Sequence, residues 1–430
     1  MISDERAFLV GIDIFGDHSL LGVDASLEEL AMLADTAGLE VVGQTYQKLT
    51  TPNPATFVGS GKVDEVKTWV EELGANVVIF DDELSPRHQR ELEERLGDEL
   101  RVLDRTALIL DIFAQHARTR EGSLQVELAQ YVYRLPRLTR AWTHLVRQTG
   151  GSASKGGVGL RGPGETQLEV DRREIRRRIA RLERDLVDVR AHRERHRAQR
   201  ARTGISTIAL VGYTNAGKST LLNRLSESEV YVADQLFATL DPTTRRVALP
   251  SGQDVLMTDT VGFIQKLPHS LVAAFRATLE EITEADFLLH VVDASHPQAD
   301  AQIKAVERTL SQDLEIESIP GLLVLNKIDA LEDEQDRETF ESLRSAYPDA
   351  ICISARTGMG VSTLIAALDG ALSSMMVPIS VRIPYQHGRD ISQFYDLADS
   401  VEERHFSTYI ELSGTLAPRH VGLFDIYRVP

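Results

Sequence analysis

The sequence predicts an α/β protein built around a mostly parallel sheet with one antiparallel edge. Three observations support this prediction. Short apolar runs alternate with helical patterns in residues 1–118 and again in residues 203–373, which is typical of parallel sheets covered by helices. Residues 119–202 instead repeat apolar side chains at helical spacing. The length of 430 residues exceeds what one core usually holds and favours two to four domains.

Residues 1–118 form the predicted N-terminal α/β domain. Apolar runs such as AFLVGIDI and NVVIFDDE are separated by helical patterns such as KVDEVKTWVEELG. The stretch FVGSGK (57–62) is similar to a phosphate-binding loop, but Thr56 stands where the first glycine is required and no Ser or Thr follows Lys62. We therefore interpret this stretch as a turn that opens a helix.

Residues 119–202 predict an antiparallel, coiled-coil-like helical hairpin. Apolar residues in 124–145 and in 175–189 follow alternating steps of four and three, as in a helix packed on another helix. We expect Pro136 to kink the first arm. A loop at 148–169 with seven glycines joins the arms, and loops of this length without an element of their own are usually functional or disordered.

Charge is concentrated in the predicted hairpin. The whole chain has a net charge of −18, yet residues 123–202 hold 19 Lys or Arg and 9 Asp or Glu, a net of +10. Residues 172–202 alone hold 13 Arg and 5 acids. A solvated helix face is the simplest explanation of charged residues, but these arginines outnumber their acidic partners. The hairpin, with Lys155 and Arg161 in its loop, is therefore predicted to bind the phosphates of RNA or DNA.

Other features of the composition argue for a reducing compartment. Cys352 is the one cysteine, so no disulfide forms within the chain. The N-terminus does not fit a secretory signal, and no apolar run approaches the roughly 18 residues of a membrane span. We expect a cytoplasmic protein.

The stretch GYTNAGKS (212–219) has the form G-x-x-x-x-G-K-[ST] and stands between a strand pattern and a helical pattern. This context is typical of a phosphate-binding loop. Glycines let the backbone amides surround phosphates, Lys218 is suited to the β- and γ-phosphates, and the Ser219 hydroxyl to magnesium. The candidate phosphate-binding residues are Gly212, Tyr213, Thr214, Asn215, Ala216, Gly217, Lys218, Ser219 and Thr220.

Two further stretches have the composition of segments that sense a terminal phosphate. In LFATLDPTTRR, Thr239, Thr243 and Thr244 each qualify as a magnesium ligand by composition alone. In DTVG (259–262), Asp259 is suited to hold magnesium through water and the Gly262 amide to contact the γ-phosphate. The candidate residues are Phe237, Ala238, Thr239, Leu240, Asp241, Asp259, Thr260, Val261 and Gly262.

NKID (326–329) and SAR (354–356) predict guanine recognition. The Asp329 carboxylate can accept both donors of the guanine edge, whereas adenine presents an acceptor there, and such a site rejects the wrong base strongly. Asn326 is expected to brace the loop and contact the base, and the Ala355 amide to contact guanine O6. The candidate base-binding residues are Asn326, Lys327, Ile328, Asp329, Ser354, Ala355 and Arg356. GTP is favoured over ATP.

Together with GGVGLRGPGETQLEVDRR (156–173), these motifs resemble the HflX family of ribosome-associated GTPases over about 370 residues. The resemblance implies that residues 203–373 are a P-loop G domain. Residues 374–430, where the resemblance is less diagnostic, are expected from their own pattern to form a small α+β domain. The resemblance also selects Thr239, with Ser219, as a ligand of Mg²⁺, and makes Lys218, Thr239 and Gly262 the candidate catalytic residues. It further implies binding to the large ribosomal subunit near its catalytic centre, and a role in splitting or rescuing stalled ribosomes under stress.

Phe263 stands where many GTPases place a glutamine that orients the attacking water. The resemblance extends to GTPases with a hydrophobic residue there, so we expect slow hydrolysis that the ribosome stimulates. Gln265 is a secondary candidate for the missing group. Asn215 occupies a position that helps to bind potassium in some GTPases without the glutamine, which makes K⁺ a second candidate cofactor.

The expected partners are GTP or GDP and the rRNA of the large subunit, bound through residues 123–202. We expect a monomer without a membrane span, peripheral to the ribosome or to a membrane. The alternative function is that of an RNA-remodelling ATPase or GTPase in ribosome assembly.

Overall fold

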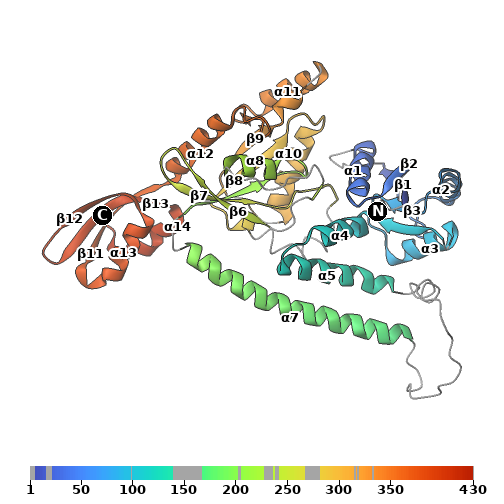
Figure 1. Cartoon of the computed structure of the whole chain (residues 1–430), viewed down its shortest axis with the longest axis horizontal. Helices are drawn as coiled ribbons and strands as arrows, with labels where there is room; N and C mark the ends of the chain where they lie inside the picture. The colour runs from blue at the N-terminus through green and yellow to red at the C-terminus, as the bar shows by residue number, and fades with distance from the viewer. Residues whose placement is uncertain are drawn as a thin grey trace. The chain divides into compact units, whose positions relative to one another are not determined.

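Within the part of the chain that it describes, the computed structural model contains three separate sheets and a long helical segment (Figure 1). The described residues are 5–15, 22–97, 99–138, 167–201, 205–226, 236–237, 242–266, 281–313, 316, 319–331 and 334–429. No helix among them is long and apolar enough to cross a membrane.

The N-terminal sheet is fully parallel, with strand order β2-β1-β3-β4. The two inner strands, β1 and β3, read as largely continuous apolar runs because both faces of such a sheet are covered by helices. Side-chain caps define two of these helices, since Ser85 caps α3 and Asp104 caps α4. The elements are β1 (Arg6–Ile14), α1 (Val23–Thr36), β2 (Glu40–Leu49), α2 (Ser60–Leu73), β3 (Val77–Phe80), α3 (Pro86–Leu96), β4 (Arg101–Asp104) and α4 (Arg105–His116).

The stretch FVGSGK opens helix α2, as expected. The Gly59 amide donates to Gln47 at 2.8 Å, and the Lys62 ammonium lies 2.8 Å from the Glu65 carboxylate and 3.1 Å from the Thr45 hydroxyl. Lys62 is therefore held by its own domain.

The helical middle region consists of α5 (Arg120–Arg134), the 3₁₀ turn η1 (Leu135–Arg137) and α7 (Gln167–Ala201). Pro136 lies in the turn that ends α5. Arg178 of α7 donates two hydrogen bonds to Glu127 of α5, at 2.7 and 2.9 Å, so the two helices lie side by side. Of the predicted loop 148–169, residues 148–166 lie outside the described residues, and the last three form the start of α7.

The apolar seam predicted for α5 is only partly correct. The fully buried residues of α5 are Gly122, Gln125, Val126 and Ala129, whereas the predicted seam residues Leu124, Leu128 and Tyr131 are half-buried. The reason is that α5 contacts α4 as well as α7 and so divides its surface between two neighbours.

The sheet of residues 203–373 has strand order β10-β9-β8-β5-β7-β6. All neighbours are parallel except β6 and β7, which pair antiparallel around the turn at 249–253. The prediction of one antiparallel edge is thus confirmed. The strands are β5 (Thr207–Val211), β6 (Thr243–Ala248), β7 (Asp254–Asp259), β8 (Phe287–Asp293), β9 (Gly321–Asn326) and β10 (Ile351–Cys352).

Helices cover both faces of this sheet. One buried cluster combines strand residues with apolar side chains of α8 and α12, and a second combines them with those of α10 and α11. The helices are α8 (Lys218–Leu225), α10 (Ala299–Arg308), α11 (Glu334–Ala346) and α12 (Val361–Met375), with the single turns η2 (Thr309–Asp313) and η3 (Ile328–Ala330).

The C-terminal residues form a small antiparallel sheet of order β11-β13-β12. Phe394 and Phe424 fill its core with their rings at an angle of 78°. The elements are β11 (Val377–Pro384), η4 (Tyr385–His387), α13 (Gly388–Leu397), β12 (Asp399–His405), β13 (Tyr409–Leu416), α14 (Pro418–Val421) and η5 (Gly422–Tyr427).

By its internal contacts the chain divides into two compact units. The first joins residues 1–189 to two short segments from later in the sequence, 233–241 and 263–277. The second contains the rest of the chain. Residues 236–237 and 263–266, which adjoin the predicted γ-phosphate sensors in the sequence, therefore belong to the same unit as the N-terminal sheet.

Candidate nucleotide-binding site

The phosphate loop connects β5 to α8, and its glycines are required by close packing. Gly212 has φ +148°, and a Cβ added there would lie 2.1 Å from the Val291 carbonyl oxygen. Gly217 has φ +93°, and its Cβ would lie 2.3 Å from the Asn326 amide nitrogen. Both are backbone positions that only glycine fills without strain. The loop is thereby fixed against β8 and against the NKID loop.

Lys218 is the first residue of α8 and is buried beneath the loop. Its ammonium donates to the carbonyl oxygens of Gly212, at 3.1 Å, and Tyr213, at 2.7 Å. Burial lowers the pKa of Lys218 to about 8, against a smaller opposing effect of Asp259. The ammonium is thus held where the β- and γ-phosphates of a nucleotide in this loop are expected.

Ser219 and Asp259 form a pair of oxygen ligands. The Ser219 hydroxyl donates to the Asp259 carboxylate at 2.5 Å, because β5 and β7 are neighbours and bring the ends of these two motifs together. A hydroxyl and a carboxylate beside a phosphate loop are the donors that Mg²⁺ takes in P-loop enzymes, together with phosphate oxygens and water. The described residues therefore fit this ion. The other expected ligand, Thr239, lies outside the described residues.

The DTVG segment lies directly on the phosphate loop. A Cβ added to Gly262 would lie 2.7 Å from Thr214 Cα and 3.0 Å from the Lys218 ammonium nitrogen. Its glycine is thus required by close approach. The Thr260 hydroxyl donates to the Leu210 carbonyl at 2.6 Å and holds the segment on β5, while Val261 is buried.

Asn326 braces the site from both sides. Its side chain donates to the Ala216 carbonyl at 2.8 Å and accepts from the Ala355 amide at 2.9 Å. The Ala355 amide, which the sequence assigns to guanine O6, is therefore engaged by Asn326 in this structure. Asn326 ties the phosphate loop to the SAR loop, which is the bracing role predicted for it.

Asp329 presents an ionised carboxylate. A hydrogen bond from Ser354 and, to a smaller extent, the charge of Arg356 lower its pKa below the ordinary value. Arg356 lies 2.5 Å from this carboxylate, and its side chain is 76% exposed. An exposed cation can move aside at little cost, so a guanine edge can replace Arg356 on Asp329. Ile328, the residue before Asp329, lies with it in η3. Lys327 pairs with Asp293 at 2.7 Å.

The remaining predicted residues differ in burial, and four of them lie outside the described residues. Asn215 is exposed at the tip of the loop with φ +58°, and Thr220 is half-buried in α8. Phe237 is buried against Phe113 of the N-terminal domain. The residues that lie outside the described part of the chain are Ala238, Thr239, Leu240 and Asp241.

Two residues at the site escaped the sequence analysis. Arg224 of α8 donates to the carbonyl of Ala355 at 3.2 Å and to that of Arg356, and so supports the SAR loop. His290 of β8 is the second. Burial, and then the charge of Lys218, lower its pKa to about 4, so it is neutral at physiological pH. No motif marks either residue in the sequence.

Three family models match consecutive parts of the chain: a GTP-binding GTPase N-terminal domain at 24–114, a GTP-binding GTPase middle region at 116–200, and a 50S ribosome-binding GTPase at 207–327. Among solved structures, the chain is similar to a GTP-binding protein of Sulfolobus solfataricus in complex with GDP. The identity is 24% and the TM-score 0.42, over 85% of this chain and 98% of that one.

Curated relatives match most of the chain. GTPase HflX of Escherichia coli (strain K12) is 48% identical over 393 residues, which cover 91% of this chain and 89% of the relative. GTPase HflX of Caldanaerobacter subterraneus subsp. tengcongensis is 46% identical over 401 residues, which cover 93% of this chain and 88% of the relative. At this identity over about nine tenths of its length, the chain belongs to the HflX family of GTPases.

Proposed function

We propose that the GTP-bound protein binds the large ribosomal subunit through α7 and the adjoining loop, and that this contact stimulates hydrolysis. We further propose that binding separates stalled ribosomes into subunits under stress. The support is the match of residues 207–327 to a 50S ribosome-binding GTPase, together with a helix, α7, that holds 12 arginines and 7 acidic residues. Since ribosomes are the proposed partner, the expected location is the cytoplasm.

The observation that carries this proposal is the charge of α7. Five arginines in its first half are exposed: Arg173, Arg176, Arg177, Arg181 and Arg184. Arginine presents a planar set of donors that matches phosphate oxygens, and clustered arginines on one helix are the electrostatic feature expected of an RNA-binding surface. The ribosome is the large RNA-rich partner that the family match indicates.

Phe263 supports the dependence on a partner. Its side chain is 4% exposed and carries no group that orients water. Groups supplied by a partner raise the hydrolysis rate of comparable GTPases by about 10³ to 10⁵. A ribosome that supplies such a group would confine hydrolysis to the bound state.

Sedimentation of intact ribosomes tests the splitting step. With a non-hydrolysable GTP analogue, we expect the protein to convert 70S ribosomes into subunits, and with GDP to leave them intact. The first result is expected because the analogue keeps the protein in the conformation that binds the ribosome and is not hydrolysed. Intact 70S particles carrying the bound analogue complex would refute splitting and leave ribosome binding in place.

We also propose that Asn215 helps to bind a potassium ion beside the nucleotide phosphates. Its exposed position at the loop tip allows its amide oxygen to face a cation. Replacing KCl by NaCl at equal ionic strength should lower GTP turnover severalfold in the native protein and have little effect in Asn215→Ala. Equal turnover of the native protein in both salts would contradict a role for K⁺ in GTP hydrolysis.

A further inference from the structure

Helix α4 of the N-terminal domain contacts both segments that flank the γ-phosphate sensors. Arg105, its first residue, reaches the segment that follows Gly262, and Phe113, two turns later, packs on Phe237. The two contacts are about 12 Å apart along the helix at 1.5 Å per residue. One rigid element therefore touches both nucleotide-sensing segments.

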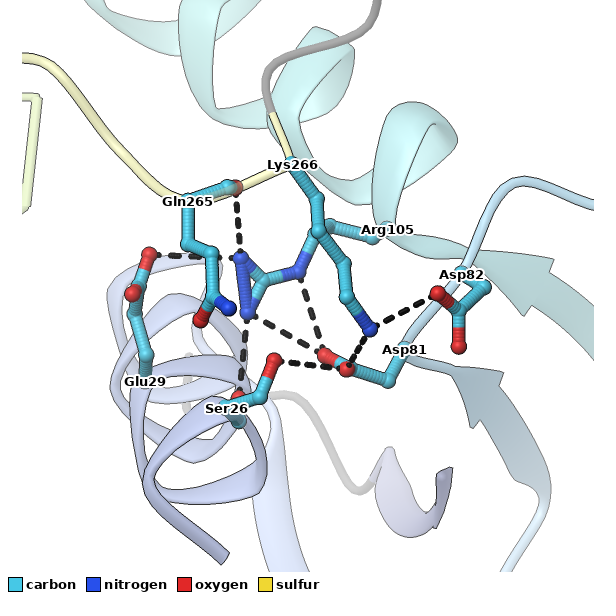
Figure 2. A network of polar contacts seen from close by, with 7 residues as sticks. All are labelled: Ser26, Glu29, Asp81, Asp82, Arg105, Gln265 and Lys266. Atoms are coloured by element: carbon cyan, nitrogen blue, oxygen red, sulfur yellow. Dashed lines mark hydrogen bonds and ion pairs between the residues drawn. The ribbon is translucent and has the colours of Figure 1, made fainter. Parts of the chain in front are cut away.

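The Arg105 contact is built into the core of the N-terminal domain. Figure 2 shows its guanidinium surrounded by Asp81, Glu29, the Ser26 carbonyl and the Gln265 carbonyl. Arg105 is 1% exposed and donates to Gln265 at 2.9 Å. A buried guanidinium has donors on all sides that need acceptors, and the Gln265 carbonyl supplies one of them from a segment far along the chain.

Lys266 supplies the charge that this site lacks. Its ammonium lies 2.6 Å from Asp81 and 2.7 Å from Asp82 (Figure 2). Without it, Asp81, Asp82 and Glu29 would face the single charge of Arg105. Burial raises the pKa of Asp81, but Arg105 and Lys266 outweigh that effect and hold it below the ordinary value. Withdrawing Lys266 would leave a buried carboxylate poorly compensated, which is costly.

The Phe113 contact is apolar and equally buried. Its ring and that of Phe237 lie 4.6 Å apart at 67°, and both side chains are at most 3% exposed. Phe237 and Lys266 also share an unusual backbone conformation, with φ +57° and +53°. Residues other than glycine hold such angles only when their surroundings fix them. Phe237 and Lys266, the residues that contact the N-terminal domain, are therefore each fixed in their backbone conformation.

We propose that Arg105, Lys266 and Phe113 are positioning residues for the GTPase reaction, and that α4 couples the nucleotide state to the N-terminal domain. Gly262 and Gln265 are three residues apart, at most about 10 Å of extended chain. Because Gln265 is anchored while Gly262 lies on the phosphate loop, the anchor limits where the Gly262 amide can be. In this proposal, the contacts hold the Gly262 amide in position for a γ-phosphate.

The variant Lys266→Met tests this proposal while it keeps the Arg105–Asp81 pair of the N-terminal domain. We expect its affinity for a non-hydrolysable GTP analogue to fall by 5- to 150-fold, the usual range of coupling between sites, and its affinity for GDP to change less than about twofold. Lys266→Arg should restore the analogue affinity. Lys304→Met, which removes an exposed lysine paired with Asp300 on α10, is the matched control.

Hydrogen exchange of the amides of residues 105–116 separates coupling from a purely structural role. A purely structural contact would protect these amides equally with either nucleotide. In the native protein, the GTP analogue should protect these amides more than GDP does. The difference should disappear in Lys266→Met and in Phe237→Leu, and persist in Lys304→Met. Equal protection of native α4 by both nucleotides would overturn the proposal, and so would tighter binding of the analogue by Lys266→Met.

Discussion

The variant Asp329→Asn is expected to weaken GTP binding by about 10²- to 10⁴-fold. The carboxylate is expected to accept both donors of the guanine edge. Hydrogen bonds to a charged group contribute about 1.5–3 kcal/mol each, and each 1.4 kcal/mol changes the affinity tenfold. An amide offers one acceptor and presents a donor where the carboxylate presents a second acceptor. Xanthine has an oxygen in place of the guanine amine, so xanthosine triphosphate should bind the variant better than GTP does.

Competition binding with a fluorescent guanine nucleotide measures this change. Asp300→Asn, which removes an exposed carboxylate elsewhere in the same sheet domain, should bind GTP like the native protein. If Asp329→Asn kept an ATPase activity that RNA stimulates, the carboxylate would have no part in base selection, and a role as an RNA-remodelling ATPase would be favoured.

Charge reversal of Arg176 and Arg177 is expected to abolish cosedimentation with the large ribosomal subunit at physiological salt. Both side chains are exposed, and removing one arginine–phosphate interaction lowers the slope of log affinity against log salt by roughly one. GTP affinity of the free protein should be unchanged, because neither residue belongs to the nucleotide site. Sedimentation at several salt concentrations measures both the weaker binding and the slope.

Arg178, their neighbour, serves as the comparison. It pairs with Glu127 and so holds α7 to α5. We expect Arg178→Gln to reduce thermal stability more than the salt slope, whereas the Arg176 and Arg177 reversals should do the opposite. Normal cosedimentation of the double reversal would remove α7 from the ribosome-binding surface.

The sequence predicted those parts of the structure that depend on local pattern. The order of strands and helices, the antiparallel edge at β6 and β7, and the phosphate loop each follow from residues close together in the chain. The packing of α5 was less predictable, because heptad spacing shows that a helix has a buried face but not that it has two neighbours. Sequence spacing therefore identified the helix and misjudged which face is most buried.

The interactions that the sequence could not show join distant residues. Asn326 bonds to Ala216 and Ala355, and Arg105 bonds to Gln265, 160 residues later. Neither Arg105 nor Lys266 belongs to a sequence motif. Their roles depend on contacts that only the fold creates: Arg105 with the Gln265 carbonyl, and Lys266 with the carboxylates of Asp81 and Asp82. Phe237 is a predicted nucleotide-binding residue two positions before Thr239, and nothing in the sequence indicates that its ring packs on Phe113.

Single-turnover GTP hydrolysis, with and without purified large ribosomal subunits, is the most direct test of the account. A buried phenylalanine at position 263 and the phosphate loop with its buried Lys218 predict tight binding with slow turnover for the free protein, and a rise of about 10³- to 10⁵-fold when subunits are added. A free protein that hydrolysed GTP at the stimulated rate, with no response to the subunits, would contradict it.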